Sequence, residues 1–191
     1  MKYQAVVIGA SAGGLNAFSE VLTELSKDFS LPIFIVQHLM ENDDSYLATH
    51  LNQITQGRTV IEACDKEIIQ KNTIYVAPPG YHMLIENKAA IALSLEPPVN
   101  YSRPSIDLLF SSACDVYKNQ LIAILLTGAN QDGSIGLKLI NQTGGMCIVQ
   151  DPKSASAPMM PESAIIKVPR AKVMQLVEIT QWLNQMEMKN G

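Results

Sequence analysis

Three polar residues, each following an apolar run of about strand length, could together carry out nucleophilic chemistry. They are Ser11, within the turn Gly9–Gly13, His38 and Asp132. In a Ser/His/Asp set the histidine takes the proton of the serine, and the carboxylate orients the histidine and stabilises its protonated form. If the three runs are parallel strands, their carboxyl ends meet at one edge of a sheet, where ligands bind in such folds. The sequence therefore predicts that these three residues lie together.

The turn around Ser11 fits the pattern G-x-S-x-G between a strand and a helix, with Ala10 and Ala12 at the variable positions. In a nucleophile elbow this pattern lifts the serine clear of the sheet. The N–H groups of the following helix then face developing negative charge. A glycine turn that binds a phosphate and a purely structural turn are the alternatives. The dinucleotide pattern G-x-G-x-x-G does not match, because Ser11 stands at its second glycine.

The other candidate residues also have structural alternatives. His38 is either a general base or a loop histidine bound to backbone. Asp132 is either the carboxylate that orients His38 or the N-cap of a helix that begins at Gly133. We expect His50 on a helix surface, whereas His82 either packs in the core or lines the same cleft.

The order of elements predicts a three-layer α/β fold with a mainly parallel, Rossmann-like doubly wound sheet and a small antiparallel hairpin. We expect Ser105 to cap a helix and Arg103 to be solvated or to bind a carboxylate or carbonyl. Strands are expected near 5–8, 33–36, 59–63, 74–77, 121–126 and 146–149, with the hairpin at 83–95. Helices are expected around Leu15–Leu25, Leu47–Ile54, Ile106–Tyr117, Ile135–Ile140 and Leu176–Met186. The apolar residues that begin and end each of these ranges are expected to face inward.

Composition excludes several classes of protein. The chain has 191 residues, 47% of them hydrophobic, and a net charge of -4, so we expect one globular domain over 1–191. It has no cluster of Lys and Arg, which argues against nucleic-acid binding. Its apolar runs are too short for membrane insertion. Cys64, Cys114 and Cys147 have no metal-binding spacing and predict free thiols in a reducing cytoplasm.

These motifs together resemble the catalytic domain of the chemotaxis receptor protein-glutamate methylesterases, the CheB type. The resemblance covers about residues 5–183. It rests on the Ser11 turn and on Gln37-His38, followed by three longer stretches. These are Ala77-Pro78-Pro79-Gly80-Tyr81-His82-Met83, Pro97-Pro98-Val99-Asn100 with Arg103-Pro104-Ser105-Ile106-Asp107, and Leu126-Thr127-Gly128 with Asp132-Gly133.

The resemblance implies a serine esterase that removes the methyl group from protein glutamate γ-methyl esters and releases methanol. Some family members also deamidate receptor glutamines. It implies Ser11 as nucleophile, His38 as general base and then acid, and Asp132 as orienting carboxylate, with no metal or organic cofactor. The implied partner is a methylated chemoreceptor or a similar methylated protein. Because no receiver domain precedes Ser11, we expect any regulator to act in trans.

The chain departs from the family pattern at two places. Ala129-Asn130 stand where the family usually has Met-Gly, in a loop whose backbone N–H helps to form the oxyanion hole. Ala12 replaces a threonine that is common after the serine. Two alternatives to catalysis therefore stay open: a ligand- or protein-binding module of the same fold with a weakened site, and a nucleotide-binding protein that uses the turn Gly9–Gly14.

Overall fold

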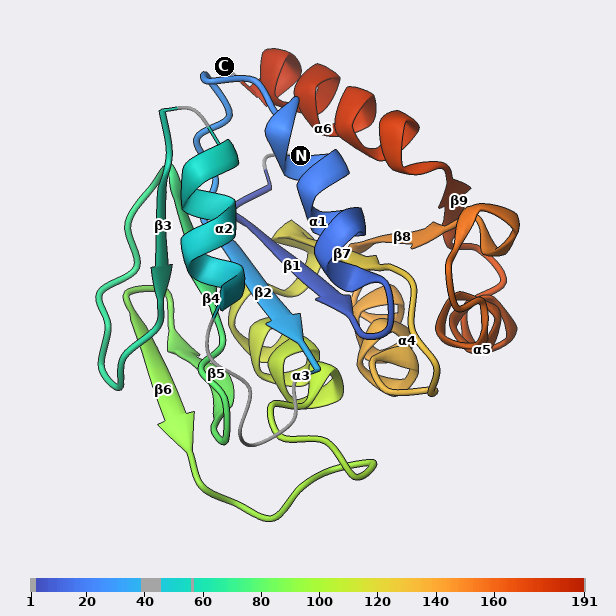
Figure 1. The fold of residues 1–191 in the computed structure, drawn as a ribbon, viewed down its shortest axis with the longest axis horizontal. Coiled ribbons are helices and arrows are strands. Elements are labelled where there is room, and N and C mark those ends of the chain that lie inside the picture. Colours follow the sequence, from blue (N-terminus) through green and yellow to red (C-terminus); the bar gives the residue numbers. More distant parts are fainter. Residues whose placement is uncertain (1–2, 39–45, 56, 191) are drawn as a thin grey trace.

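A computed structural model describes residues 3–38, 46–55 and 57–190, with side chains up to residue 186. Within these residues one sheet has seven strands in the order β3-β4-β2-β1-β7-β8-β9, and every neighbouring pair is parallel. The predicted α/β class with a mainly parallel sheet is confirmed (Figure 1). The strands are β1 (Ala5–Ala10), β2 (Ile33–Gln37), β3 (Thr59–Glu62), β4 (Thr73–Val76), β7 (Leu121–Leu125), β8 (Met146–Gln150) and β9 (Lys172–Met174).

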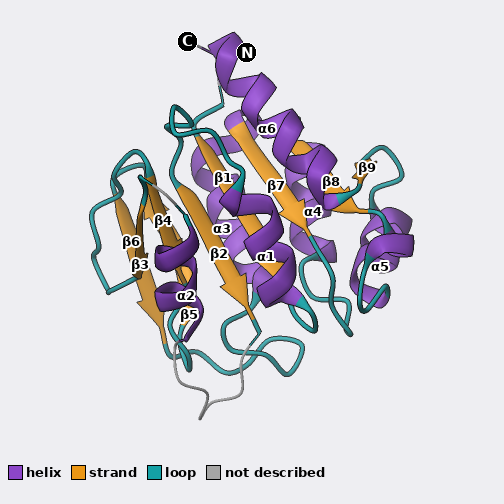
Figure 2. Cartoon of the chain, turned by 45° about the horizontal axis from the view of Figure 1, so that its top comes forward, coloured by secondary structure: helices purple, strands orange, loops and turns teal. Residues whose placement is uncertain are grey.

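The central strands are apolar along their whole length because both faces of the sheet are covered. β1 and β7 have no exposed residue, as expected for parallel strands buried between two layers of helices. On one face the core includes residues of α1, α2 and α6, and on the other residues of α3, α4 and α5 (Figure 2). The helices are α1 (Gly14–Thr23), α2 (Tyr46–Ile54), α3 (Ile106–Tyr117), α4 (Ser134–Gln142), α5 (Met159–Lys167) and α6 (Leu176–Asn190), with short 3₁₀ turns η1 (Lys118–Gln120) and η2 (Pro152–Ser154).

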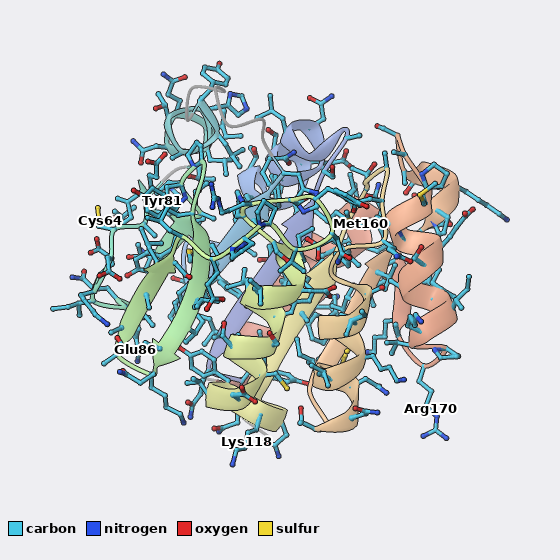
Figure 3. The ribbon with its side chains drawn as sticks, turned by 90° about the horizontal axis from the view of Figure 1, so that it is seen from below. Cys64, Tyr81, Glu86, Lys118, Met160 and Arg170 are labelled. Carbon is cyan, nitrogen blue, oxygen red and sulfur yellow. The ribbon has the colours of Figure 1, made fainter. Side chains whose placement is uncertain are left out.

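The predicted hairpin forms a second, two-stranded antiparallel sheet from β5 (His82–Asn87) and β6 (Ala90–Ser94). Its apolar residues Met83, Ile85 and Ile91 pack in the same core as α3. In Figure 3 Tyr81 and Met160 lie toward one edge of the molecule, and Glu86, Lys118 and Arg170 toward the opposite edge. α3 begins at Ile106, near the edge where the strands end, and finishes at Tyr117, shortly before β7 begins at the amino-terminal edge of the sheet.

Two apolar residues that were expected to face the core are exposed instead. They are Leu15 on α1 and Ile135 on α4. The inner face of α4 combines Ser134 and Gly136 with Leu137 and Ile140, and at Gly136 α4 lies very close to α3. A Cβ added at Gly136 would come within 2.5 Å of Phe110 Cβ. Apolar periodicity cannot detect the two small residues of this face.

The sequence prediction also missed α5 and β9. α5 buries only Met160, Pro161 and Ala164, so its apolar pattern is weak. β9 has three residues and lies at the edge of the sheet. Within residues 3–38, 46–55 and 57–190, no helix combines the length and apolar character needed to cross a membrane.

Candidate active site

An open pocket of about 630 Å³ lies where β1 and β2 end. The turn that joins β1 to α1 forms one side of it, and two later loops contribute further side chains. Its lining residues are Ser11, Ala12, Gly13, Gly14, Leu15, Asn16, Gln37, His38, Ser102 and Asn130. Ser11 and His38 thus share one cavity, as the strand order predicts, whereas Asp132 is fully buried and lies behind His38.

The turn that carries Ser11 is held by two hydrogen bonds to Thr127, in the loop after β7. The Ser11 N–H donates to Thr127 O at 2.9 Å, and the Thr127 hydroxyl donates to Ala12 O at 2.8 Å. Gly13, the N-cap of α1, takes the left-handed conformation with φ of 79°. The chain therefore turns at Gly13, and Ser11 itself has ordinary negative φ, unlike the serine of a strained elbow.

Gln37, the last residue of β2, joins the nucleophile candidate to the base candidate. Its side-chain amide donates to Ser11 O at 2.8 Å and to His38 O at 3.0 Å. These carbonyls belong to two different strand ends, so one side chain fixes their separation. A Cβ added at Gly14 would lie 1.9 Å from Gln37 Oε1, so a glycine at position 14 leaves room for this amide.

His38 and Asp132 are in direct contact. His38 Nε2 lies 2.8 Å from Asp132 Oδ2. The side chain of His38 is 9% exposed, and that of Asp132 is fully buried. Because the carboxylate accepts this hydrogen bond, Nε2 carries the proton and the second ring nitrogen, Nδ1, is free to accept one.

Asp132 also caps a helix, but not the one that the sequence predicted. α4 begins after Gly133, which has φ of 87° and makes no side-chain cap. The Asp132 carboxylate instead accepts the Ile106 N–H at 2.7 Å and the Asp107 N–H at 3.2 Å, both in the first turn of α3. The prediction that Asp132 caps α4 is therefore wrong, because the αL conformation of Gly133 turns the chain so that Asp132 faces α3.

Two side chains from the loop before α3 complete the shell around Asp132. The Ser105 hydroxyl donates to Oδ1 at 3.1 Å, and Asn100 Nδ2 donates to the same oxygen at 3.3 Å. Burial acts to raise the pKa of Asp132. The hydrogen bond and charge of His38, with the N–H groups of α3, outweigh burial and hold that pKa below its usual value. Asp132 is therefore ionised over the whole physiological pH range.

A second buried carboxylate, Asp107, lies next to Asp132. It accepts the Gly136 N–H at 2.7 Å, and Asn100 Nδ2 lies 3.3 Å from its Oδ2. Burial, together with the charge of Asp132, raises the pKa of Asp107 to about 6, although the Gly136 N–H opposes this. Two carboxyl groups so close together resist simultaneous ionisation, and Asp107 is the one that holds its proton more strongly.

The Nδ1 atom of His38 faces Ser102 and Asn130, two residues that line the pocket. Asn130 Nδ2 lies 3.3 Å and Ser102 Oγ 3.4 Å from this nitrogen. Among the described residues, no hydrogen bond joins Ser11 Oγ to His38. Such contacts are often loose in an enzyme without substrate and tighten when substrate binds.

The remaining candidate residues have structural roles. His82 is fully buried and outside the pocket lining: its Nδ1 accepts the Ser105 N–H at 3.1 Å, and Nε2 donates to Pro97 O at 3.2 Å. His50, half-buried on α2, contacts Ser19 Oγ at 2.9 Å. Arg103 donates to backbone carbonyls, as one alternative expected, and Ser105 caps α3 as predicted.

Several residues that this site uses carry no sequence pattern that predicts their role. Gln37, Asn100 and Thr127 belong to the motifs that support the resemblance, yet each is a common polar residue. Position offered one signal, because Gln37 and Thr127 directly end two apolar runs. Nothing in the sequence indicated that Asn100 would bridge two carboxylates 7 and 32 residues away.

The chain is similar to known proteins both in sequence and in fold. A family model described as CheB methylesterase matches residues 6–183. The crystal structure of the Thermotoga maritima CheB methylesterase catalytic domain matches with a TM-score of 0.91 and 30% sequence identity. The match covers 97% of this chain and 100% of that one.

Two relatives extend the likeness at the level of sequence. A putative protein-glutamate methylesterase/protein-glutamine glutaminase of Leptospira interrogans is 43% identical over 190 residues, covering 100% of this chain and 98% of that protein. A protein-glutamate methylesterase/protein-glutamine glutaminase of Clostridium acetobutylicum is 39% identical over 161 residues, covering 84% of this chain but 46% of that protein, so the match spans about half of the longer relative. The chain belongs to the CheB methylesterase family.

Proposed function

We propose that this chain hydrolyses γ-methyl esters of glutamate side chains in proteins, with Ser11 as nucleophile, His38 as base and Asp132 as orienting carboxylate. The observation that carries the proposal is the 2.8 Å contact of His38 with buried Asp132, beside the pocket that Ser11 lines. Membership of the CheB methylesterase family supports the reaction class.

In the first half of the reaction, Ser11 Oγ attacks the ester carbonyl carbon while its proton passes to His38 Nδ1. Nδ1 is the accepting atom because Nε2–H points to Asp132. Asp132, ionised and fully buried, stabilises the imidazolium that forms. The tetrahedral intermediate then collapses, the bond to the methoxy oxygen breaks, and His38 returns the proton to that oxygen. Methanol leaves, and the glutamyl group remains esterified to Ser11.

Backbone N–H groups near Ser11 are suited to stabilise the oxyanion. Neither the Ala12 N–H, before the first turn of α1, nor the Ala129 N–H has an acceptor within the part of the chain that the structure describes. The partial positive charge at the start of α1 favours the same negative charge. Backbone donors do not depend on the side chain, so Ala129 can supply the N–H that methionine supplies elsewhere in the family.

In the second half, water attacks the glutamyl–Ser11 ester and gives its proton to His38. Collapse of that intermediate frees the glutamate carboxylate and returns the proton to Ser11 Oγ. A glutamine side chain would follow the same route with ammonia as the leaving group. The names of both relatives include a glutaminase, so deamidation is a second candidate activity of the same site.

The openness of the pocket suits a side chain presented by a folded protein. Ser11 and His38 lie at its wall and not at the end of a narrow tunnel, and the rim carries the exposed side chain of Leu15. We propose a methylated chemoreceptor, or a protein of similar chemistry, as the substrate. The reaction would then take place in the cytoplasm, where the signalling part of such a receptor lies.

The experiment measures methanol release from methylated receptor by the purified protein and its Ser11→Ala variant. Ser19→Ala is the matched control, because Ser19 lies on α1 and also contacts a histidine, His50, yet is outside the pocket lining. Wild type and Ser19→Ala should release methanol at equal rates. Ser11→Ala should lose activity by a factor on the order of 10⁶.

A fluorophosphonate probe separates this proposal from a binding module with a weakened site. A triad serine reacts with the probe whatever the protein substrate is, so labelling does not require the right receptor. Labelling that disappears in Ser11→Ala but not in Ser19→Ala supports the hydrolase. A folded wild-type protein that neither reacts with the probe nor releases methanol would instead favour the binding module.

A further inference from the structure

We infer that Asn130 is a positioning residue that covers the basic nitrogen of His38 in the free enzyme and must give way when Ser11 attacks. The inference rests on the proposed function, because it concerns the same proton transfer. Asn130 lines the pocket, and its amide nitrogen is 3.3 Å from His38 Nδ1.

The orientation of the Asn130 amide is set by the backbone. Its Oδ1 accepts the Asp132 N–H at 3.1 Å. With the oxygen held there, the NH₂ group is the part that faces His38, where an amide can only donate. The orientation of the amide thus follows from the hydrogen bond with Asp132.

The acceptor on His38 is set from the other side of the ring. Nε2 donates to Asp132, whose pKa is held low, so the neutral ring has its lone pair on Nδ1. That lone pair is also the one that must take the serine proton. Asn130 therefore supports the reactive tautomer and at the same time occupies the site of proton transfer.

The contact is weak enough to be displaced. A distance of 3.3 Å is long for an N–H donor, and Ser102 Oγ at 3.4 Å is a second distant neighbour of Nδ1. Asn130 is partly exposed, so a small rotation that keeps the hydrogen bond of its Oδ1 with the Asp132 N–H can carry the NH₂ group away from Nδ1. Breaking one ordinary hydrogen bond before attack slows the reaction between about 2- and 10-fold.

The nearby ionisable groups are few and come from three elements. Among the described residues whose contacts surround His38 Nδ1 and Asn130, the ionisable ones are His38, Asp132 and, beyond Asp132, Asp107. Replacing Asn130 with alanine leaves all three in place. A change in the rate of Ser11 labelling in that variant therefore reports on the amide and not on the removal of a charge.

The test compares fluorophosphonate labelling of Ser11 in wild type, Asn130→Ala, Asn130→Asp and Gln131→Ala. Gln131 is exposed on the same loop and is the matched control. Asn130→Ala should label about 2- to 10-fold faster than wild type, and Gln131→Ala should match wild type. Asn130→Asp keeps the acceptor for the Asp132 N–H but turns an anionic oxygen toward Nδ1. It should label more slowly than wild type at neutral pH, because the carboxylate favours a proton on Nδ1.

Asn130→Ala that labels more slowly would overturn the inference and make the amide an oxyanion donor instead. Equal labelling would overturn it by giving the amide no part in the reaction. If the probe labels neither wild type nor any variant, the proposed function fails. In that case ¹⁵N NMR of the His38 ring still shows whether the Asn130 amide contacts Nδ1. A wild-type Nε2–H tautomer, with an Nδ1 signal that moves in Asn130→Ala, supports the hydrogen bond from the Asn130 amide to Nδ1. An Nδ1–H tautomer, or an unmoved signal, overturns it.

Discussion

Asp132 Oδ2 accepts the Ile106 N–H at 2.7 Å, so the carboxylate that contacts His38 is also the anchor of α3. One buried group thus links the start of a helix to the histidine at the end of β2. The first-turn N–H groups of a helix lack intrahelical partners and carry partial positive charge. They stabilise the Asp132 anion, which in turn is available to stabilise a protonated His38.

Because Asp132 contacts His38 and also anchors α3, Asp132→Asn should lower both activity and stability. Oδ1 accepts from Asn100, Ser105 and Asp107, and Oδ2 accepts from His38 and Ile106, so each oxygen has at least two donors. An amide nitrogen cannot accept, and buried donors are left unpaired whichever way the asparagine turns. We expect Asp132→Asn to lose about 1–3 kcal/mol of stability and about 10⁴ in turnover. Urea unfolding and methanol release measure the two effects.

Asp151→Asn is the matched control for that experiment. Asp151 caps the short 3₁₀ turn η2 through the Lys153 N–H and is outside the pocket lining. Because asparagine caps about as well as aspartate, this variant should keep both stability and turnover. If Asp132→Asn behaved like Asp151→Asn, the carboxylate charge would have no role in the reaction.

The sheet was predictable because its strands are apolar on both faces. The runs at 5–8, 33–36 and 121–126 have no polar interruption, so their type as buried parallel strands follows from the sequence. The convergence of Ser11 and His38 then follows from parallel pairing of β1 and β2. The partners of Asp132 did not follow, because they depend on the conformation of Gly133 and on the path of a loop.

The loop before α3 is a second part of the site whose conformation does not follow from the sequence. Asn100 and Tyr101 both have positive φ, at 49° and 63°, and the backbone pairs Val99 with Ser102. This tight turn brings Asn100 to Asp107 and Asp132 and brings Ser102 to the pocket. Positive φ is uncommon for residues other than glycine, so propensity would not predict it here. Tertiary hydrogen bonds to two carboxylates stabilise it.

Gln37 offers a test of how tightly Ser11 and His38 must be held. Gln37→Met keeps the size of the side chain but removes the amide that donates to both carbonyls. Misplacement of reacting groups by about 1 Å can cost on the order of 100-fold, so we expect kcat/KM to fall between about 10- and 100-fold. Gln37→Glu should lose more, since a carboxylate oxygen would face two carbonyl oxygens. An unchanged kcat/KM in Gln37→Met would show that the turn is held by Thr127 alone.

His82 should influence the site without touching it. Its Nδ1 accepts the Ser105 N–H, and the Ser105 hydroxyl donates to Asp132. His82→Phe fills the space but leaves the Ser105 N–H and Pro97 O without these partners, at a cost of about 1–3 kcal/mol. His82→Asn, which can put an amide oxygen near the position of Nδ1, should recover part of the activity lost in His82→Phe. Equal activity in both variants and wild type would show that the contacts of His82 with the loop before α3 do not affect catalysis.

The two adjacent carboxyl groups predict an unusual dependence of stability on pH. Burial, and secondly the charge of Asp132, raise the pKa of Asp107 to about 6 in the folded protein, against 3.8 as its ordinary value. Between these two values the folded chain binds more protons than the unfolded chain does. Stability contributed by this group is therefore present below about pH 4 and is lost as the pH rises through about 6.

Asp107→Asn should remove the loss of stability that accompanies the ionisation of Asp107 at rising pH. The amide resembles the protonated acid: its oxygen can accept the Gly136 N–H, and its NH₂ can donate to Asp132. At pH 4 wild type and variant should have similar free energies of unfolding. At pH 7.5 the variant should be the more stable by up to about 3 kcal/mol, the free energy that corresponds to the raised pKa. Urea unfolding at both pH values measures the difference, with Asp115→Asn, on the same helix, as control. A gap between Asp107→Asn and wild type that does not widen with pH would mean that Asp107 is ionised throughout and that its N–H partners outweigh its burial.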